Sequence, residues 1–189
     1  MSLESLDPKF VRRVGLLCCH CVRNIAYYRV GFVNEDGSGG LKQRTQFGAT
    51  VNGDMLDIAV LEWCKLFADC KAVHHWKRVI RDESEQQRFL DALLRHAGTN
   101  ESGWTRYLRS VRHYRDKFVA HLDELAVMQI PSLDVALKCA HFLYAYIRAN
   151  CPASTFAAPH FGHLPEDLSD YYEACRDEAR QAYDAGKGV

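Results

Sequence analysis

Apolar residues recur every three or four positions along most of this chain, a spacing that places them on one face of an α-helix. The longest such stripe runs through Leu56, Val60, Trp63, Phe67, Cys70 and His74. Helical patterns of the same kind cover residues 7–29, 84–96, 102–125, 132–150 and 165–185. The sequence therefore predicts an all-α fold, a single-domain helical bundle of five or six helices.

Local signals mark several of the helix ends. Asp7-Pro8 has the form of an N-cap followed by proline at the first helical position, and Gly98 is a typical stop after residues 84–96. Ser132 is the expected cap of the helix over 132–150. Between and after the helices we expect a long Gly-rich loop over 33–53, an irregular segment over 151–164 and an acidic C-terminal helix over 165–186.

The composition excludes several classes of protein. The chain has 189 residues, of which 48% are hydrophobic and 25% charged, as in a globular domain that can bury its own core. Its N-terminus lacks the pattern of a signal peptide, and no run of eighteen apolar residues could span a membrane. We expect a soluble, cytoplasmic protein with reduced cysteines and no cofactor.

The charges are balanced in number but not in position. Lys and Arg together number 24, and so do Asp and Glu. Five of the basic residues lie between Arg106 and Lys117, whereas seven acidic residues face only Arg176 and Arg180 over 166–184. The basic stretch is a candidate surface for an acidic partner such as RNA, and the acidic helix could either gate that surface or simply complete the core.

One arginine interrupts an apolar stripe within the basic stretch. The stripe consists of Trp104, Leu108, Val111, Arg115, Phe118, Leu122 and Leu125. A charged side chain at a core-facing position needs a partner or a function, because burying an unpaired charge is costly. His121, six residues after Arg115, flanks the same face.

These residues carry a resemblance to a known family. RDKFVAHLD, residues 115–123, resembles the signature of the HEPN superfamily, in which an Arg is followed directly by a polar residue and further along by a His. Its order of residues is similar to that of the phage abortive-infection branch. The resemblance implies an all-helical, commonly dimeric, metal-independent endoribonuclease of a phage-defence or toxin-type system. It implies catalytic roles for Arg115 and His121, a supporting role for Asp116, a homodimer, and a protein partner such as an antitoxin or regulator.

The chemistry of these residue types suits RNA cleavage by the 2′-hydroxyl group. A histidine can transfer protons at neutral pH, and the guanidinium fork can stabilise charge on the phosphate without a metal. Six residues of a straight helix separate two side chains by about 120°, so either the helix is distorted or two protomers share the site. The basic stretch supplies the predicted RNA contacts Arg109, Arg112, Tyr114 and Lys117.

Other interpretations remain open for each of these features. Arg115 could form an ion pair with an acidic residue of another helix, and His121 could bond a backbone carbonyl. The whole chain could then be a noncatalytic helical module that binds a protein partner or a nucleotide. Cys18, Cys19, His20 and Cys21 could bind zinc, or the cysteines could pack in the core beside an exposed histidine. The basic residues over 71–81 could form a solvated helix end or contact RNA.

Overall fold

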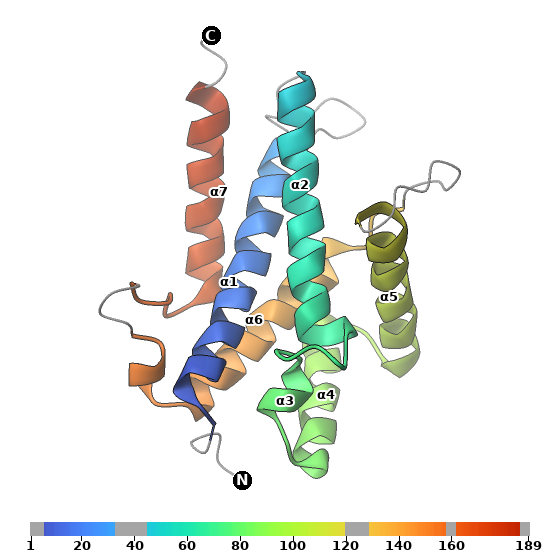
Figure 1. The fold of residues 1–189 in the computed structure, drawn as a ribbon, viewed down its shortest axis with the longest axis vertical. Coiled ribbons are helices and arrows are strands. Elements are labelled where there is room, and N and C mark those ends of the chain that lie inside the picture. Colours follow the sequence, from blue (N-terminus) through green and yellow to red (C-terminus); the bar gives the residue numbers. More distant parts are fainter. Residues whose placement is uncertain (1–5, 33–44, 120–128, 158–161, 186–189) are drawn as a thin grey trace.

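The computed structural model describes residues 6–32, 45–119, 129–157 and 162–185, and all regular elements in these ranges are helical (Figure 1). Its α-helices are α1 (Pro8–Gly31), α2 (Gln46–Trp63), α3 (Trp76–Val79), α4 (Glu83–Ala97), α5 (Glu101–Tyr114), α6 (Leu133–Asn150) and α7 (Leu168–Ala185). Two π turns, η2 (Cys64–Ala68) and η3 (Arg115–Val119), and a 3-10 turn, η4 (Ala153–Thr155), accompany them. The all-α prediction is confirmed, and the one-turn α3 is an element that the periodicity did not predict.

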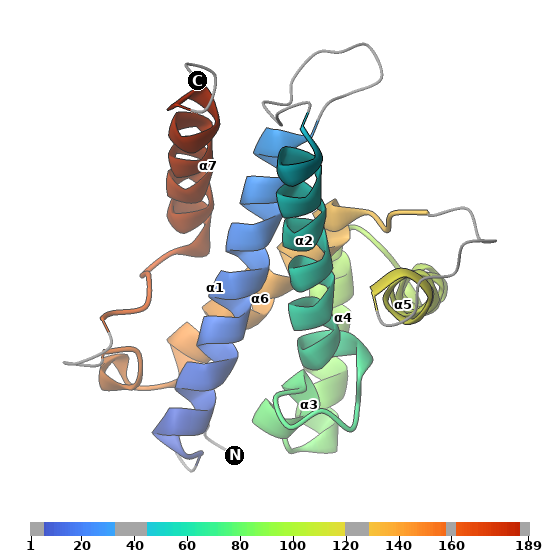
Figure 2. The same ribbon diagram turned by 45° about the horizontal axis from the view of Figure 1, so that its top comes forward.

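Helix α1 forms the centre of the bundle. It packs against α2, α6 and α7, and α4 packs against α6 (Figures 1 and 2). Its buried side chains include Val14, Val22 and Ile25, and its cysteines Cys18, Cys19 and Cys21 are also buried. This burial confirms that the three cysteines pack in the core as small apolar groups, and it raises the pKa of their thiols.

Several helix ends agree with the sequence signals. The side chain of Asp7 accepts a hydrogen bond of 2.9 Å from the backbone N–H of Lys9 at the start of α1. Gly98 ends α4 with a φ of 72°, a left-handed conformation that glycine adopts without steric cost. Ser132 precedes α6 as predicted, but its side chain makes no cap hydrogen bond.

The predicted loop over 33–53 is wrong in its second part. Helix α2 begins at Gln46, where Thr45 Oγ1 accepts a hydrogen bond of 3.1 Å from the backbone N–H of Gly48. Asn52 is buried, and its side chain donates a 3.0 Å hydrogen bond to the carbonyl oxygen of Tyr28 in α1. Packing against α1 therefore overrides the low helix propensity of glycine and asparagine. Residues 33–44 lie outside the described ranges.

The predicted stripe over 56–74 is correct only in its first four positions. Leu56, Val60, Trp63 and Phe67 are buried, but Cys70 is exposed and His74 is only partly buried. The reason is that α2 ends at Trp63 and passes into the π turn η2, after which the chain leaves the helix direction. Beyond that turn, residues spaced three and four apart no longer lie on one face of a helix.

The acidic C-terminal helix completes the core. Helix α7 begins at Leu168 rather than Pro165, packs against α1, and buries Leu168, Tyr172, Cys175 and Ala179. Figures 1 and 2 show α7 and α5 on opposite sides of the pair α1 and α2. The gate hypothesis is therefore wrong for α7 and the basic stretch of the same chain.

The predicted irregular segment over 151–164 is held by side chains of the bundle. Arg12 donates to the carbonyl oxygens of Phe156 at 2.7 Å and Gly162 at 2.9 Å, and Tyr144 donates to the carbonyl oxygen of Pro165. Apart from η4, the described part of this segment has no helix, as predicted. Within the described ranges, no helix is long and apolar enough to cross a lipid bilayer.

Candidate functional site

An aromatic cluster between α2 and α5 fixes the position of the basic stretch. The indole ring of Trp63 packs nearly edge-on against the rings of Trp104 and Tyr107, with distances between ring centroids of 5.7 Å and 5.1 Å. Tyr107 also donates a 2.7 Å hydrogen bond to the carbonyl oxygen of Ser132. Because this face of α5 is anchored, Arg109 and His113 on its other side are exposed.

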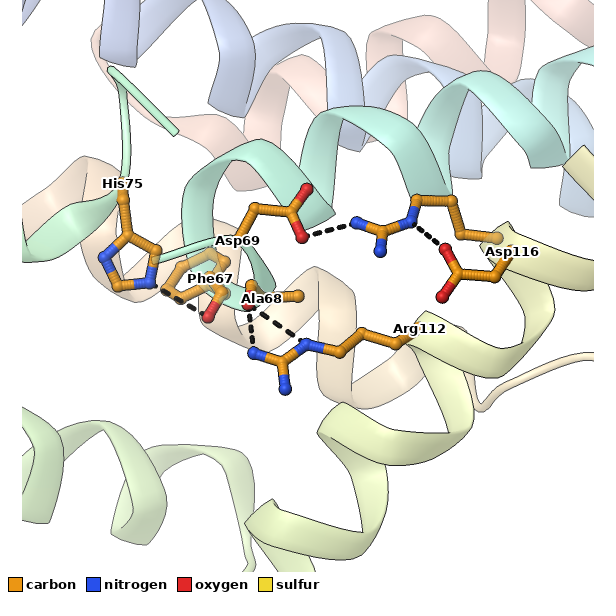
Figure 3. A network of polar contacts seen from close by, with 7 residues as sticks. Phe67, Ala68, Asp69, His75, Arg112 and Asp116 are labelled. Atoms are coloured by element: carbon orange, nitrogen blue, oxygen red, sulfur yellow. Dashed lines mark hydrogen bonds and ion pairs between the residues drawn. The ribbon is translucent and has the colours of Figure 1, made fainter. Parts of the chain in front are cut away.

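The π turn η2 presents a backbone carbonyl to α5. It closes with a 2.9 Å hydrogen bond from the backbone N–H of Asp69 to the carbonyl oxygen of Cys64. Arg112 of α5 binds the carbonyl oxygen of Ala68 through Nε at 3.1 Å and also through Nη2 (Figure 3). The guanidinium group therefore satisfies a carbonyl at a helix end, where intrahelical donors are lacking.

Arg115 is held by two carboxylates. Its Nη1 donates to Oδ1 of Asp69, the residue that follows η2, and its Nε donates to Oδ1 of Asp116 at 2.8 Å. Partial burial acts to lower the pKa of Arg115, but the bonds to Asp116 and Asp69 raise it, so the guanidinium stays charged. An ion pair was one of the two interpretations of Arg115, and it is observed, but its partner Asp69 lies in the segment after η2 rather than on another helix. Sequence spacing alone did not single out Asp69.

The helix predicted over 102–125 is distorted within the stretch 115–123. The expected helix over 102–125 is regular only to Tyr114, and the π turn η3 occupies Arg115–Val119. A π turn contains one residue more than an α-turn, and such turns occur frequently at functional sites. A distorted helix was one of the two geometries compatible with the spacing of Arg115 and His121. His121 lies outside the described residues, as do Leu122 and Leu125.

Tyr114 is a correction to the predicted RNA contacts. Its side chain is 2% exposed, and its hydroxyl group donates a 2.8 Å hydrogen bond to Oδ1 of Asp57 in α2. Burial raises the pKa of Asp57, although the bond from Tyr114 opposes that effect. Tyr114 therefore serves packing between α2 and α5 and cannot stack on a base. The heptad interval from Tyr107 placed it on the buried side rather than beside the arginines.

An open groove lies along the exposed side of α5. It has a volume of about 410 Å³ and is lined by Thr105, Leu108, Arg109, Arg112, His113 and Asp116. Two of the predicted RNA contacts, Arg109 and Arg112, thus line one groove together with Asp116. Lys117 is exposed but does not line it. His113 also lines the groove, although it is absent from the predicted RNA contacts.

The basic residues over 71–81 do not form a helix end of α2. His75 is buried and caps α3: its Nε2 lies 3.1 Å from the carbonyl oxygen of Phe67, and its Nδ1 accepts from the backbone N–H of Lys77 at 3.3 Å. Lys77 and Arg78 are exposed, in accord with a solvated surface. Among the described residues, no group of three His, Cys, Asp or Glu side chains could hold a metal ion.

The protein is therefore an all-α bundle with a basic groove on α5, and Arg115, next to that groove in the sequence, is paired with two carboxylates. Comparison with family models, with curated proteins and with solved structures yields no match for this chain.

Proposed function

We propose that this protein is a HEPN-like, metal-independent endoribonuclease that cleaves RNA by attack of the 2′-hydroxyl group. The observation that carries the proposal is the open groove on α5, in which Arg109, Arg112 and His113 lie directly before the signature that begins at Arg115. Guanidinium groups in an open groove suit the phosphates of RNA, because each can form two parallel hydrogen bonds with a phosphate.

Each residue of the signature receives one role. Arg115 stabilises the charge on the phosphate, and its bonds to Asp69 and Asp116 leave further N–H groups of its fork for that purpose. Asp116 orients the guanidinium, since it holds Nε at 2.8 Å. His121 transfers protons to and from the attacking and leaving oxygens. Arg109, Arg112 and Lys117 contact the RNA backbone.

The biological setting follows from the resemblance of residues 115–123. We infer a cytoplasmic homodimer in a phage-defence system of the abortive-infection kind or in a toxin-type system, with a protein partner that acts as antitoxin or regulator. A shared site would require two copies of the segment around η3 to meet across a two-fold axis.

The test is cleavage of a fluorescently labelled single-stranded RNA by the wild type, His121→Ala and the matched control His163→Ala, each with and without EDTA. His163 is an exposed histidine outside the signature. The proposal expects cleavage by the wild type and by His163→Ala, resistance of that cleavage to EDTA, and none by His121→Ala. Equal cleavage by His121→Ala would contradict the assignment, and loss of cleavage in EDTA would indicate a metal-dependent reaction instead.

A second candidate function is supported by the pairing of Arg115. Two carboxylates already neutralise its charge, as in an arginine that only joins two structural segments. In that case the chain is a noncatalytic helical module that binds a protein partner or a nucleotide through the groove on α5. Binding of RNA or nucleotide by the wild type and by His121→Ala with equal affinity, without cleavage by either, would favour this alternative.

A further inference from the structure

A second hollow lies at the opposite side of the bundle from α5. It has a volume of about 340 Å³ and is bounded by the last turns of α1, the first turns of α2 and the last turns of α7. These three helix ends lie together at one end of the molecule (Figures 1 and 2). We name it the α7 groove. Its volume falls within the range of small-molecule sites, about 300–1,000 Å³.

Small residues keep the α7 groove open, and large apolar residues form its walls. Gly48 of α2 and Ala179 and Ala182 of α7 line it where longer side chains would fill the space. Phe47 lies at its edge and is 75% exposed, the highest exposure among the large hydrophobic residues of the described ranges. Tyr183 forms another part of the wall. An exposed aromatic ring at the edge of an apolar hollow is typical of a surface that a ligand covers.

Among the described residues that line the α7 groove, only Glu178 has a charged side chain. Its Oε2 accepts a 2.5 Å hydrogen bond from the hydroxyl group of Tyr27, another lining residue. Burial and the bond to Glu178 raise the pKa of Tyr27, so the phenol remains protonated and donates to Oε2 of Glu178. The groove therefore combines aromatic faces with one anionic group.

We propose that the α7 groove binds a small organic cation with an apolar or aromatic body, such as an arylalkylamine. Its ammonium group would pair with Glu178, and its body would lie against Phe47, Met55 and Tyr183. Ammonium groups are attracted both to carboxylates and to the faces of aromatic rings. An anion of the same shape would be repelled by Glu178. The site is separate from the groove on α5, so this inference does not rest on the proposed nuclease.

The test uses three probes that share one body and differ in charge: 4-phenylbutylamine, 4-phenylbutanol and 4-phenylbutyrate. Binding to the full chain is followed by NMR of 13C-methyl-labelled methionine and alanine, which reports on Met55 and Ala182, and by calorimetric titration at constant ionic strength. We expect the amine to bind about tenfold or more tightly than the butyrate, with the alcohol in between, and to shift both methyl signals.

Three variants separate the contributions to binding. Glu178→Gln should remove the preference for the amine while the alcohol still binds, and Ala182→Trp should fill the groove and abolish binding of all three probes. Glu173→Gln, an exposed carboxylate of α7 outside the groove, is the matched control and should behave as the wild type. Unchanged melting curves establish that each variant is folded.

Four outcomes of these binding measurements would overturn the proposal. They are equal binding of the three probes by the wild type, no binding of any of them, an unaltered amine preference in Glu178→Gln, and unaltered binding in Ala182→Trp. A mass that rises with protein concentration in the wild type but not in Ala182→Trp would likewise overturn it, because a second copy of the chain would then be the occupant.

Discussion

The role of Arg115 is determined by the residues that it contacts and not by its position in the apolar stripe. Its side chain is 20% exposed, and that of Asp69 is 36% exposed. A pair at this depth is only partly screened by water, so each partner depends on the other more than in a fully exposed pair. The arginine thus joins η3 to the segment after η2.

We expect a measurable coupling energy between Arg115 and Asp69. Arg115→Met and Asp69→Asn should each lower the free energy of unfolding, and the double variant should lose less than the sum by about 1 kcal/mol. Urea unfolding of the four proteins in low salt measures this cycle, and added salt should reduce the coupling. Additive losses would show that the pair contributes no stability and would strengthen a role for Arg115 outside folding.

His75 should make folding sensitive to mild acid. Burial lowers its pKa, and its Nδ1 accepts from Lys77, so the folded protein holds the neutral ring. Below the unfolded value of about 6.5 the unfolded chain binds a proton that the folded chain resists. The contribution of His75 is therefore complete above that pH and is lost as the pH falls toward the folded pKa.

The measurement is urea unfolding of the wild type, His75→Asn and the control His163→Asn at pH 7.5 and pH 5.5. Burial also lowers the pKa of His20, His74 and His141, so the wild type should lose stability between the two pH values for several reasons. His75→Asn should lose less than the wild type, because asparagine can cap α3 without titrating. An equal loss in His75→Asn and the wild type would exclude His75 as a contributor.

For single residues, the sequence predicted which side chains are unusual but not what they contact. The position of Arg115 in an apolar stripe indicated a partner, yet the partner Asp69 follows a π turn that no local pattern announces. Tyr114 was misassigned because it was grouped with the neighbouring arginines, although its heptad interval from Tyr107 places it on the buried side. Hydrogen bonds between segments far apart in the sequence, such as Tyr114 to Asp57, depend on packing that periodicity does not encode.

At the scale of elements, the two π turns lie where α2 and α5 meet the site. Turn η2 directs the carbonyl of Ala68 to Arg112, and turn η3 begins at Arg115. Strong periodicity and end signals predicted α4 and α6 closely, since local residues determine both. The π turns and α3 could not be predicted, because each arises where tertiary packing outweighs the regular i to i+4 pattern.

Arg112 and Arg109 form a matched pair that separates structure from RNA binding. Both line the groove, but Arg112 also binds the carbonyl oxygen of Ala68. Arg112→Ala should lower the free energy of unfolding by about 1–2 kcal/mol, as loss of a charged hydrogen bond to a carbonyl does, whereas Arg109→Ala should change it by less than about 0.5 kcal/mol.

Under the proposed function, both variants should also weaken RNA binding. Each removed phosphate contact should reduce the slope of log affinity against log salt by about 0.7 for a single strand. Fluorescence anisotropy of a labelled RNA between 50 and 200 mM salt, roughly the range in which such slopes are measured, provides this value. Unaltered RNA affinity in Arg109→Ala would place the RNA, if it binds, outside the groove.

The bundle as a whole keeps its two candidate sites apart. Helix α7 covers α1 on one side, and α5 stands on the other with α2 between them (Figures 1 and 2). The charge asymmetry visible in the sequence therefore corresponds to two faces rather than to one contact. Composition and periodicity predicted the fold class of the whole molecule, but the order of helices around α1 depends on long-range contacts that the sequence does not display.

The proposed function includes a homodimer, in which two copies of the chain could share a site. Light scattering at micromolar concentration should therefore give a mass near twice the 21.6 kDa of one chain. A mass of one chain at all concentrations, combined with RNA cleavage, would show that one protomer contains a complete site. The same measurement on Ala182→Trp tells whether the α7 groove takes part in self-association.

Mixing inactive variants distinguishes a shared site from a site within one chain. In a shared site, Arg115 of one protomer acts with His121 of its partner, so a dimer of Arg115→Ala with His121→Ala has one intact site and one that lacks both residues. Random exchange makes half of the dimers mixed, so the mixture should recover about one quarter of the wild-type activity per chain. If each chain uses its own Arg115 and His121, the mixture should stay as inactive as its components. Subunit exchange is verified with differently tagged chains. If exchange occurs and the mixture is still inactive, the site lies within one chain.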